Sequence, residues 1–70
     1  MNELSQFLLP TLQQGDVITL MLKSGAITGK VEEYREDVQA IKISDAHFAG
    51  VYLPFIMTIS TYLIIELAKM

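Results

Sequence analysis

Acidic side chains crowd one short segment of the sequence, and their spacing could support metal binding or proton transfer. The carboxylates belong to Glu32, Glu33, Glu36 and Asp37. Paired carboxylates can hold a divalent cation or act as general acid and base. These four surround a polar stretch that is expected to be a turn, where a run of charges is normally solvated. We therefore favour a solvated turn over a metal or acid–base site.

The remaining residue types offer little catalytic chemistry. Asp45 and His47 stand two residues apart, and a lone histidine in a loop is most often a surface residue. The sequence has no cysteine, no nucleophile beside a base, no glycine-rich phosphate loop and no zinc-ligand spacing. We predict that the protein is not an enzyme and that it uses no metal and no cofactor.

Small size and high apolar content together indicate a partner. The chain has 70 residues, which make one domain, and 51% of them are apolar. A domain this short buries only about 60% of the surface of its unfolded chain, so the apolar excess suggests that another copy covers part of it. The formal charge of -3 gives no electrostatic reason to expect nucleic acid. The acidic N-terminal segment does not resemble a signal peptide, and we expect a cytoplasmic protein.

Residues 1–14 predict an N-terminal helix. The apolar residues that recur at helical spacing, and should form its buried face, are Leu4, Phe7, Leu8 and Leu12. Asn2 can cap the start of the helix. Pro10 is tolerated only in a first turn or at a kink, because it lacks an N–H and its ring clashes one turn back. Gly15 is the expected C-terminal cap.

Residues 16–70 predict five short strands of an antiparallel sheet. Alternation in the first three strands places one set of side chains inward: Ile18, Leu20, Leu22, Ile27, Val31, Ile41 and Ile43. A turn follows each of the first two strands, and a longer loop is expected at 44–50. Gly25 suits a hairpin position with positive φ, and Gly29 suits a sharp bend within a strand. Tyr34 can fill one end of the core while its hydroxyl reaches water.

The stretch 48–65, FAGVYLPFIMTISTYLII, carries no charge and could be a membrane span or two strands. Its 18 residues reach the lower limit for a membrane helix. β-Branched residues are frequent in it, Pro54 interrupts it, and its flanks carry no excess of positive charge. We therefore favour two strands, broken near MTIS, and no membrane partner. Because both faces of these strands are apolar, they need a neighbour.

The order of these motifs resembles the Sm-like family, and within it the bacterial Hfq proteins. FLLPTLQQGDVITLMLKSG is similar to their helix and first strand, with Phe7 and Leu22 among the matches. GKVEEY resembles part of the first Sm motif, VQ stands where Met-Asn is usual, and FIMTIST at 55–61 resembles Tyr-Lys-His-Ala-Ile-Ser-Thr. The resemblance covers nearly the whole chain. It implies a strongly bent, five-stranded small barrel of the SH3-like kind, spanning 16–70.

The same resemblance implies an oligomeric ring and a nucleic-acid partner. Sm-like rings pair their last two strands across subunits, which would supply the missing neighbour and close the open edges. They bind single-stranded RNA by stacking and hydrogen-bonding its bases. The positions that match the binding motifs are Arg35, Asp37, Gln39, Ile56 and Met57, with Lys30 and Lys42 as possible phosphate contacts.

Several of these positions depart from the family pattern. Asp37 stands where a base-stacking residue is common, and Ile56 and Met57 replace a Lys-His pair. The arginines of the Hfq rim fall on uncharged residues, namely Leu12, Gln13 and Gly15. Gln39 keeps an amide that could read a base edge, or it is an ordinary loop residue. Two functions therefore stay open: a ring that binds single-stranded RNA or DNA, and an oligomeric structural or protein-interaction module that has lost RNA binding.

Overall fold

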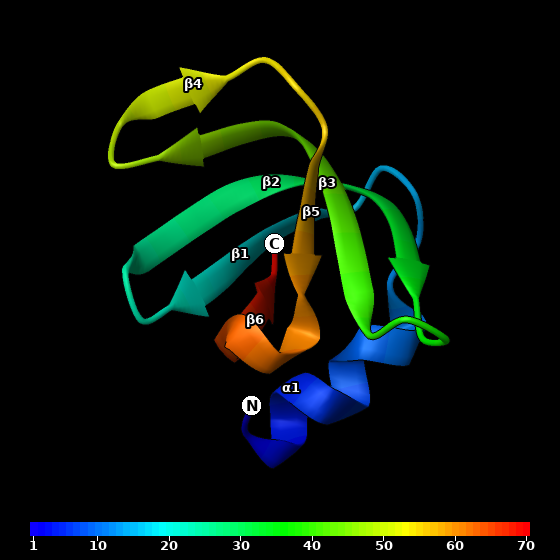
Figure 1. The fold of residues 1–70 in the computed structure, drawn as a ribbon. Coiled ribbons are helices and arrows are strands. Elements are labelled where there is room, and N and C mark those ends of the chain that lie inside the picture. Colours follow the sequence, from blue (N-terminus) through cyan, green and yellow to red (C-terminus); the bar gives the residue numbers. More distant parts are fainter.

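An N-terminal helix and six antiparallel strands make up the chain (Figure 1). The computed structural model describes all 70 residues. The elements are α1 (Glu3–Leu8), the 3-10 turn η1 (Leu9–Thr11), β1 (Val17–Leu22), β2 (Gly25–Arg35), β3 (Ala40–Phe48), β4 (Val51–Leu53), β5 (Met57–Ser60), the 3-10 turn η2 (Thr61–Leu63) and β6 (Ile64–Lys69). The expected mostly β fold with one N-terminal helix is confirmed.

The strands form one sheet in the order β4-β3-β2-β1-β6, and β5 pairs with the other half of β3. β4 lies along Ala46–Phe48, whereas β5 lies along Ala40–Ile43. There are six strands rather than five, because the chain leaves the sheet at 54–56, where Pro54 cannot donate to a ladder. The sheet is not closed into a barrel, since β5 and β6 are not paired.

The core is apolar and comes from alternate positions of the central strands. It consists of Leu9, Ile18, Leu20, Ile27, Val31, Ile41, Ile43, Ala46, Ile59, Ile64 and Leu67. The alternation predicted for the first three strands is confirmed, except that Leu22 is only half-buried. Tyr34 packs against this core from its rim, as expected for an aromatic ring with a polar end.

Two glycines allow the sheet to turn and bend where the sequence predicted. Gly25 has φ of +136°, a conformation that other residues rarely adopt, and it follows the turn between β1 and β2. At Gly29 a Cβ atom would lie 3.1 Å from the carbonyl oxygen of Ser44 on β3. The register between β2 and β3 shifts beside it, between Thr28 and Lys30. Close contact between the backbones therefore accompanies the bend.

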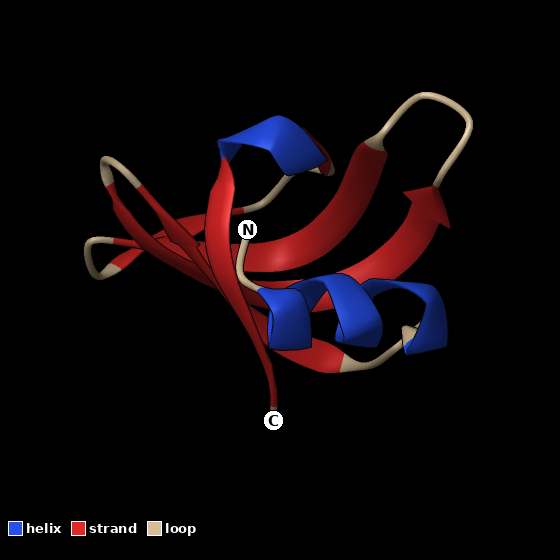
Figure 2. Cartoon of the chain, turned by 90° about the horizontal axis from the view of Figure 1, so that it is seen from below, coloured by secondary structure: helices blue, strands red, loops and turns tan.

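The helix, which lies beside β6 (Figure 2), is shorter than predicted and turned differently. Asn2 caps it as expected, with its side-chain oxygen accepting from the Ser5 amide at 2.8 Å. Leu4 and Phe7 are 67% and 75% exposed, so the predicted buried face is wrong for both. Ser5 and Leu9 face the sheet instead, because the Ser5 hydroxyl bonds the backbone of β6. Leu8 and Leu12, which were also predicted to be buried, are half-buried.

Three predicted boundaries are also corrected. Gly15 is not the helix cap, since helical structure ends by Thr11; it sits in a turn with φ of +94° and donates to the carbonyl of Val31. The loop expected at 44–50 is mostly strand, because β3 continues to Phe48 and buries Ala46. MTIS is itself β5, and the interruptions lie on either side of it, at 54–56 and 61–63.

Candidate functional site

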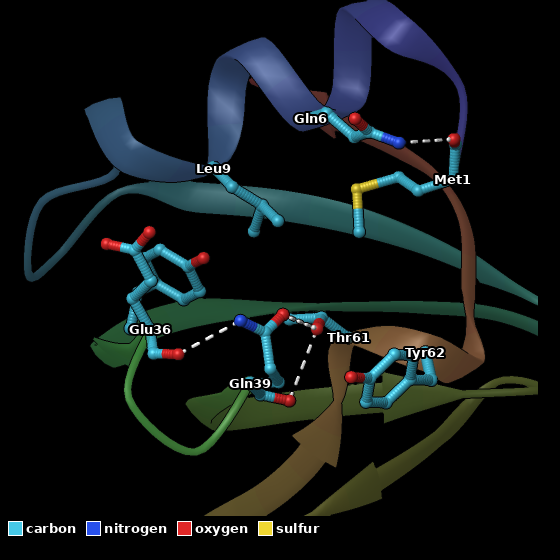
Figure 3. Close-up of a pocket in the computed structure, with 8 residues that line it drawn as sticks. Met1, Gln6, Leu9, Glu36, Gln39, Thr61 and Tyr62 are labelled. Atoms are coloured by element: carbon cyan, nitrogen blue, oxygen red, sulfur yellow. Dashed lines mark hydrogen bonds between the residues drawn. The ribbon is translucent and has the colours of Figure 1, made fainter.

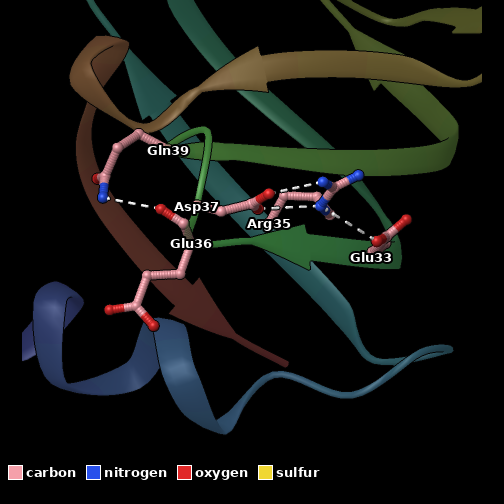
Figure 4. Close-up of polar contacts among 5 residues, drawn as sticks. All are labelled: Glu33, Arg35, Glu36, Asp37 and Gln39. Carbon is pink, nitrogen blue, oxygen red and sulfur yellow. Dashed lines mark hydrogen bonds and ion pairs between the residues drawn. The ribbon is translucent and has the colours of Figure 1, made fainter.

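Three of the residues predicted to bind nucleic acid, Arg35, Asp37 and Gln39, lie around the turn that joins β2 to β3, but on different sides of it. On one side the Arg35 guanidinium forms a two-pronged pair with Asp37, at 2.7 and 3.0 Å, and lies 3.6 Å from the carboxylate of Glu33 (Figure 4). The hydrogen bond from Arg35 is the main reason that the pKa of Asp37 falls below its ordinary value. This ion pair satisfies the only positive charge at the turn.

Gln39 points to the other side of the turn, where its side-chain amide bonds to the turn itself and to η2. The residue has φ of 54°, a left-handed conformation uncommon outside glycine and asparagine. Its side-chain nitrogen donates to the carbonyl of Glu36 at 3.0 Å, and its side-chain oxygen accepts from the Thr61 hydroxyl at 3.2 Å (Figure 3). The Thr61 amide also donates to the Gln39 carbonyl, at 2.9 Å. Gln39 therefore fastens the β2–β3 turn to η2.

A hollow of about 350 Å³ opens beside Gln39, between the helix and the β2–β3 turn (Figure 3). Its walls come from three parts of the chain: Met1, Gln6 and Leu9; Tyr34, Glu36 and Gln39; Thr61 and Tyr62. Of the predicted site residues, only Gln39 lines it. The helix residues were not predicted as part of a site, and no spacing in the sequence brings them to this turn.

Ile56 and Met57 differ in role. Ile56 is 61% exposed in the segment between β4 and β5. Met57 begins β5, lies opposite Ile43 and packs against the core. The positions that replace the family's Lys-His pair thus provide one exposed apolar side chain and one core contact.

The possible phosphate contacts are also separated. The Lys30 ammonium lies 3.5 Å from Asp45, whereas Lys42 forms no ion pair. Elsewhere, Lys69 pairs with Asp16 at 3.3 Å. Three of the five basic residues are therefore engaged with carboxylates, and Lys23 and Lys42 are left unpaired. The arrangement gives no continuous basic surface.

A second polar cluster, missed from the sequence, joins β3 to β4. The Tyr52 hydroxyl donates to Asp45 at 2.9 Å, and the rings of Tyr52 and His47 lie 5.2 Å apart. This bond is the main cause that lowers the pKa of Asp45 and raises that of Tyr52. Pairing of His47 with Tyr52 follows from the tight turn at 49–50, but the expected loop at 44–50 hid it. The Tyr52 hydroxyl and the Asp45 carboxylate therefore satisfy each other, and His47 adds a ring contact.

The acidic residues do not gather around a common point. Glu32 accepts from the Ser44 hydroxyl, Glu33 and Asp37 face Arg35, and Glu36 turns toward the helix (Figure 4). No group of three or more potential metal ligands lies together. None of the helices could span a membrane, since the α-helix α1 has only six residues.

Comparisons of the chain with protein-family models, with curated proteins and with solved structures gave no match.

Proposed function

We propose that this chain is the subunit of an Sm-like homo-oligomeric ring, assembled through its last strands. The order of elements, the bend at Gly29 and the pairing of β4 and β5 with the two halves of β3 support an Sm-like arrangement. The single observation that carries the proposal is the distribution of exposed apolar side chains. Eight of the thirteen large ones lie between residues 51 and 70. Five of these eight side chains flank the edge strands of the sheet, and exposed apolar side chains beside an edge strand favour association with another chain.

The two ends of the sheet supply the backbone groups for this assembly. Nothing pairs with the outer edge of β4 and β5, and Val51, Phe55 and Ile56 are exposed there. At the opposite end, Leu63 and Ile65 are exposed beside β6. A contact between these unlike surfaces repeats from copy to copy, and a ring is its closed form.

The N-terminal segment limits where strands from two copies can pair. Asn2 donates to the carbonyl of Ile65 at 3.3 Å, and Ser5 accepts from the amide of Leu67 at 2.8 Å. These contacts occupy the outer edge of β6 in its middle. The neighbouring strand therefore pairs at the start of β6 or displaces the helix, while Leu63 and Ile65 give apolar contact.

Light scattering coupled to size exclusion tests the assembly. We expect the wild-type mass to be several times the 7.8 kDa of one chain. Val51→Lys, at the bare edge, should reduce the mass to that of a folded monomer, since a charge would be buried in the contact. Val38→Lys is the matched control, because Val38 is equally exposed but lies in the β2–β3 turn. A folded wild-type monomer would overturn the proposal.

Binding of single-stranded RNA is the second candidate function. It is favoured by Lys42, whose amine forms no ion pair and which lies opposite Thr58 of β5. The exposed Ile56 stands two residues before Thr58 and could give a base an apolar contact. With so few free cations we expect weak affinity and a shallow salt dependence, because the slope counts neutralised phosphates.

Fluorescence anisotropy with uridine-rich and adenine-rich RNA at two salt concentrations separates the candidates. Lys42→Gln should weaken binding, and Lys23→Gln, in the β1–β2 turn, is the control. Gln39→Ala should cost about 1–3 kcal/mol of binding if the amide reads a base. Assembly without RNA binding at either salt concentration would leave a structural or protein-interaction role.

A further inference from the structure

A small groove lies at the end of the sheet where β6 begins. Its walls are Leu22, Lys23 and Ser24, where β1 turns into β2, and Leu63 of η2. Leu22 pairs with Ile64, so the groove opens directly beside the first residue of β6. Leu63 is 61% exposed, and the Lys23 ammonium forms no ion pair. The groove therefore offers apolar walls and one unpaired cation.

Phe55 is the aromatic side chain of the bare outer edge of β4 and β5 that has no partner within the chain. It stands in the segment 54–56, where the chain leaves the sheet, and it is 57% exposed. The other exposed ring of this edge, Tyr52, is tied to Asp45 through its hydroxyl. The ring of Pro54 fixes a backbone angle directly before Phe55, so less freedom is lost when the phenyl ring is immobilised.

The groove and Phe55 of one chain lie far from each other. β4 stands at one end of the sheet and β6 at the other. Figure 1 shows the β1–β2 turn and the segment 54–56 on opposite sides of the molecule. In the assembly proposed above, the bare edge of one copy faces the start of β6 in the next copy. That contact brings Phe55 of one copy to the groove of its neighbour.

We propose that Phe55 of each copy inserts into the groove between Leu22 and Leu63 of the next copy and anchors the ring. The inference rests on the proposed assembly. The groove has a volume of about 250 Å³, and an apolar cavity of about 150 Å³ is enough to hold benzene. The phenyl ring packs between the two leucines, and its face attracts the Lys23 ammonium. Residues 48–65 carry no charge, so the incoming edge does not repel that cation.

Backbone pairing alone gives this contact little strength. Asn2 bonds to the carbonyl of Ile65 and Ser5 to the amide of Leu67, which leaves only a short stretch of the outer edge at the start of β6. A ladder this short contributes few hydrogen bonds. Interfaces take most of their binding energy from a few side chains, often aromatic, that fill desolvated pockets. Phe55 in the groove supplies such an anchor.

Light scattering over a dilution series tests the anchor. Phe55→Ala should raise the dissociation constant of the subunit contact at least about 30-fold, the scale of an aromatic hot spot. Phe7→Ala makes the same change at a ring that is 75% exposed on the helix, and it should leave assembly unchanged. Ile56→Ala changes the next residue, which is 61% exposed, and should have a much smaller effect than Phe55→Ala. Circular dichroism checks that each variant is folded.

A double-mutant cycle tests whether the ring enters this groove. Leu63→Ala should weaken the contact, and Phe55→Ala combined with Leu63→Ala should cost little more than Phe55→Ala alone, since both changes remove the same contact. Lys23→Gln should weaken assembly about two- to fivefold, the scale of an exposed contact between a cation and a ring, and only while Phe55 is present. At higher concentrations Lys23→Gln is still assembled, so it stays a valid control for RNA binding. Lys42→Gln is the control for loss of charge.

These measurements separate the anchor from the assembly on which it rests. A wild-type chain that stays monomeric at every concentration would overturn both proposals. A wild-type oligomer that Phe55→Ala leaves intact, or losses that simply add in the double variant, would overturn the anchor alone. An equal loss in Ile56→Ala would do the same, because general apolar contact rather than an inserted ring would then hold the copies together.

Discussion

The strands at the two ends of the sheet differ in whether another part of the chain covers their outer edge. At one end the N-terminal segment covers β6, where the Ser5 hydroxyl and the Asn2 amide occupy backbone groups that a further strand would use. At the other end the outer edge of β4 and β5 has no cover and is flanked by exposed apolar side chains. An uncovered apolar edge favours pairing with another chain, and a covered one resists it. The bare edge is therefore where the association that we propose is expected to begin.

The largest expected effect separates two neighbouring isoleucines of β6. Ile64 is 1% exposed, whereas Ile65 is 55% exposed. Ile64→Lys should unfold the domain, because an unpaired buried charge costs about 3–5 kcal/mol and so small a core supplies little more. Ile65→Lys should keep its circular dichroism spectrum and lose only assembly. Both variants staying folded would contradict the burial of Ile64.

Loss of the hydrogen bond between the helix and β6 should have the next largest effect on stability. Ser5→Ala leaves the Leu67 amide without its partner, and we expect a loss of about 1–3 kcal/mol in the free energy of unfolding. Ser24→Ala, in the β1–β2 turn, should have almost no effect, since its hydroxyl makes no bond. Urea denaturation measures both.

Ser5→Ala also tests whether the helix keeps other chains from pairing with β6. If the helix blocks pairing at β6, Ser5→Ala should assemble at a lower concentration than the wild type, despite its lower stability. Weaker assembly of Ser5→Ala would mean that the helix orders the β6 edge for its neighbour.

A smaller effect is expected at η2, where the chain enters β6. The Thr61 hydroxyl donates to Gln39 by either of two bonds of 3.2 Å. Thr61→Val keeps the shape and removes these bonds, so unfolding should become easier by about 0.5–1.5 kcal/mol. The Thr61 amide still holds the Gln39 carbonyl, which limits the loss. Thr58→Val, on the exposed face of β5, is the matched control.

The covered end is also the part that the sequence predicted least well. Alternation in the central strands identified Ile18, Ile41 and Ile43 as core, because one buried face and one solvated face impose a period of two. Helical spacing pointed to Leu4 and Phe7, yet the helix turns Ser5 inward. A hydrogen bond to a strand 62 residues away decided that orientation, and no local pattern encodes it.

In the candidate site, too, contacts within one segment were easier to predict than contacts between distant segments. The pair between Arg35 and Asp37 lies within one turn, so two residues that stand two apart in the sequence also lie together in the fold. The walls of the hollow at Gln39 come from three segments that are far apart in the sequence. A comparison made one motif at a time could therefore identify Gln39 but not the residues that lie around it. Thr61, matched as part of FIMTIST, gained its role only when η2 was placed beside the turn.

The smallest expected effect concerns one carboxylate at each end of the sheet. At the covered end Asp16 accepts from the Gln13 amide and pairs with Lys69 of β6, and the backbone bond is the first cause that lowers its pKa. At the bare end the bond from Tyr52 of β4 lowers the pKa of Asp45. Because both pKa values are lower in the folded chain than in the unfolded one, the stabilisation is complete above about pH 4 and is lost as the pH falls through the folded values.

Urea midpoints at pH 6 and pH 3 measure this loss in the wild type and in Asp16→Asn and Asp45→Asn. Each variant should be slightly less stable at pH 6 and should lose less than the wild type on acidification, because one titrating group is gone. The groups are solvated, so each difference should be small and should shrink further in high salt only where an ion pair contributes. In both variants the asparagine oxygen can still accept from the neutral donor, which is the Gln13 amide at one end and the Tyr52 hydroxyl at the other. Both variants lose an ion pair, Asp16→Asn with Lys69 and Asp45→Asn with Lys30. The Asp16 carboxylate is the less exposed of the two, at 21% against 50%, so water screens its pair less and the loss at Asp16 should be the larger. A larger loss in Asp45→Asn would mean that the contact at the bare end holds the fold more firmly than the contact at the covered end.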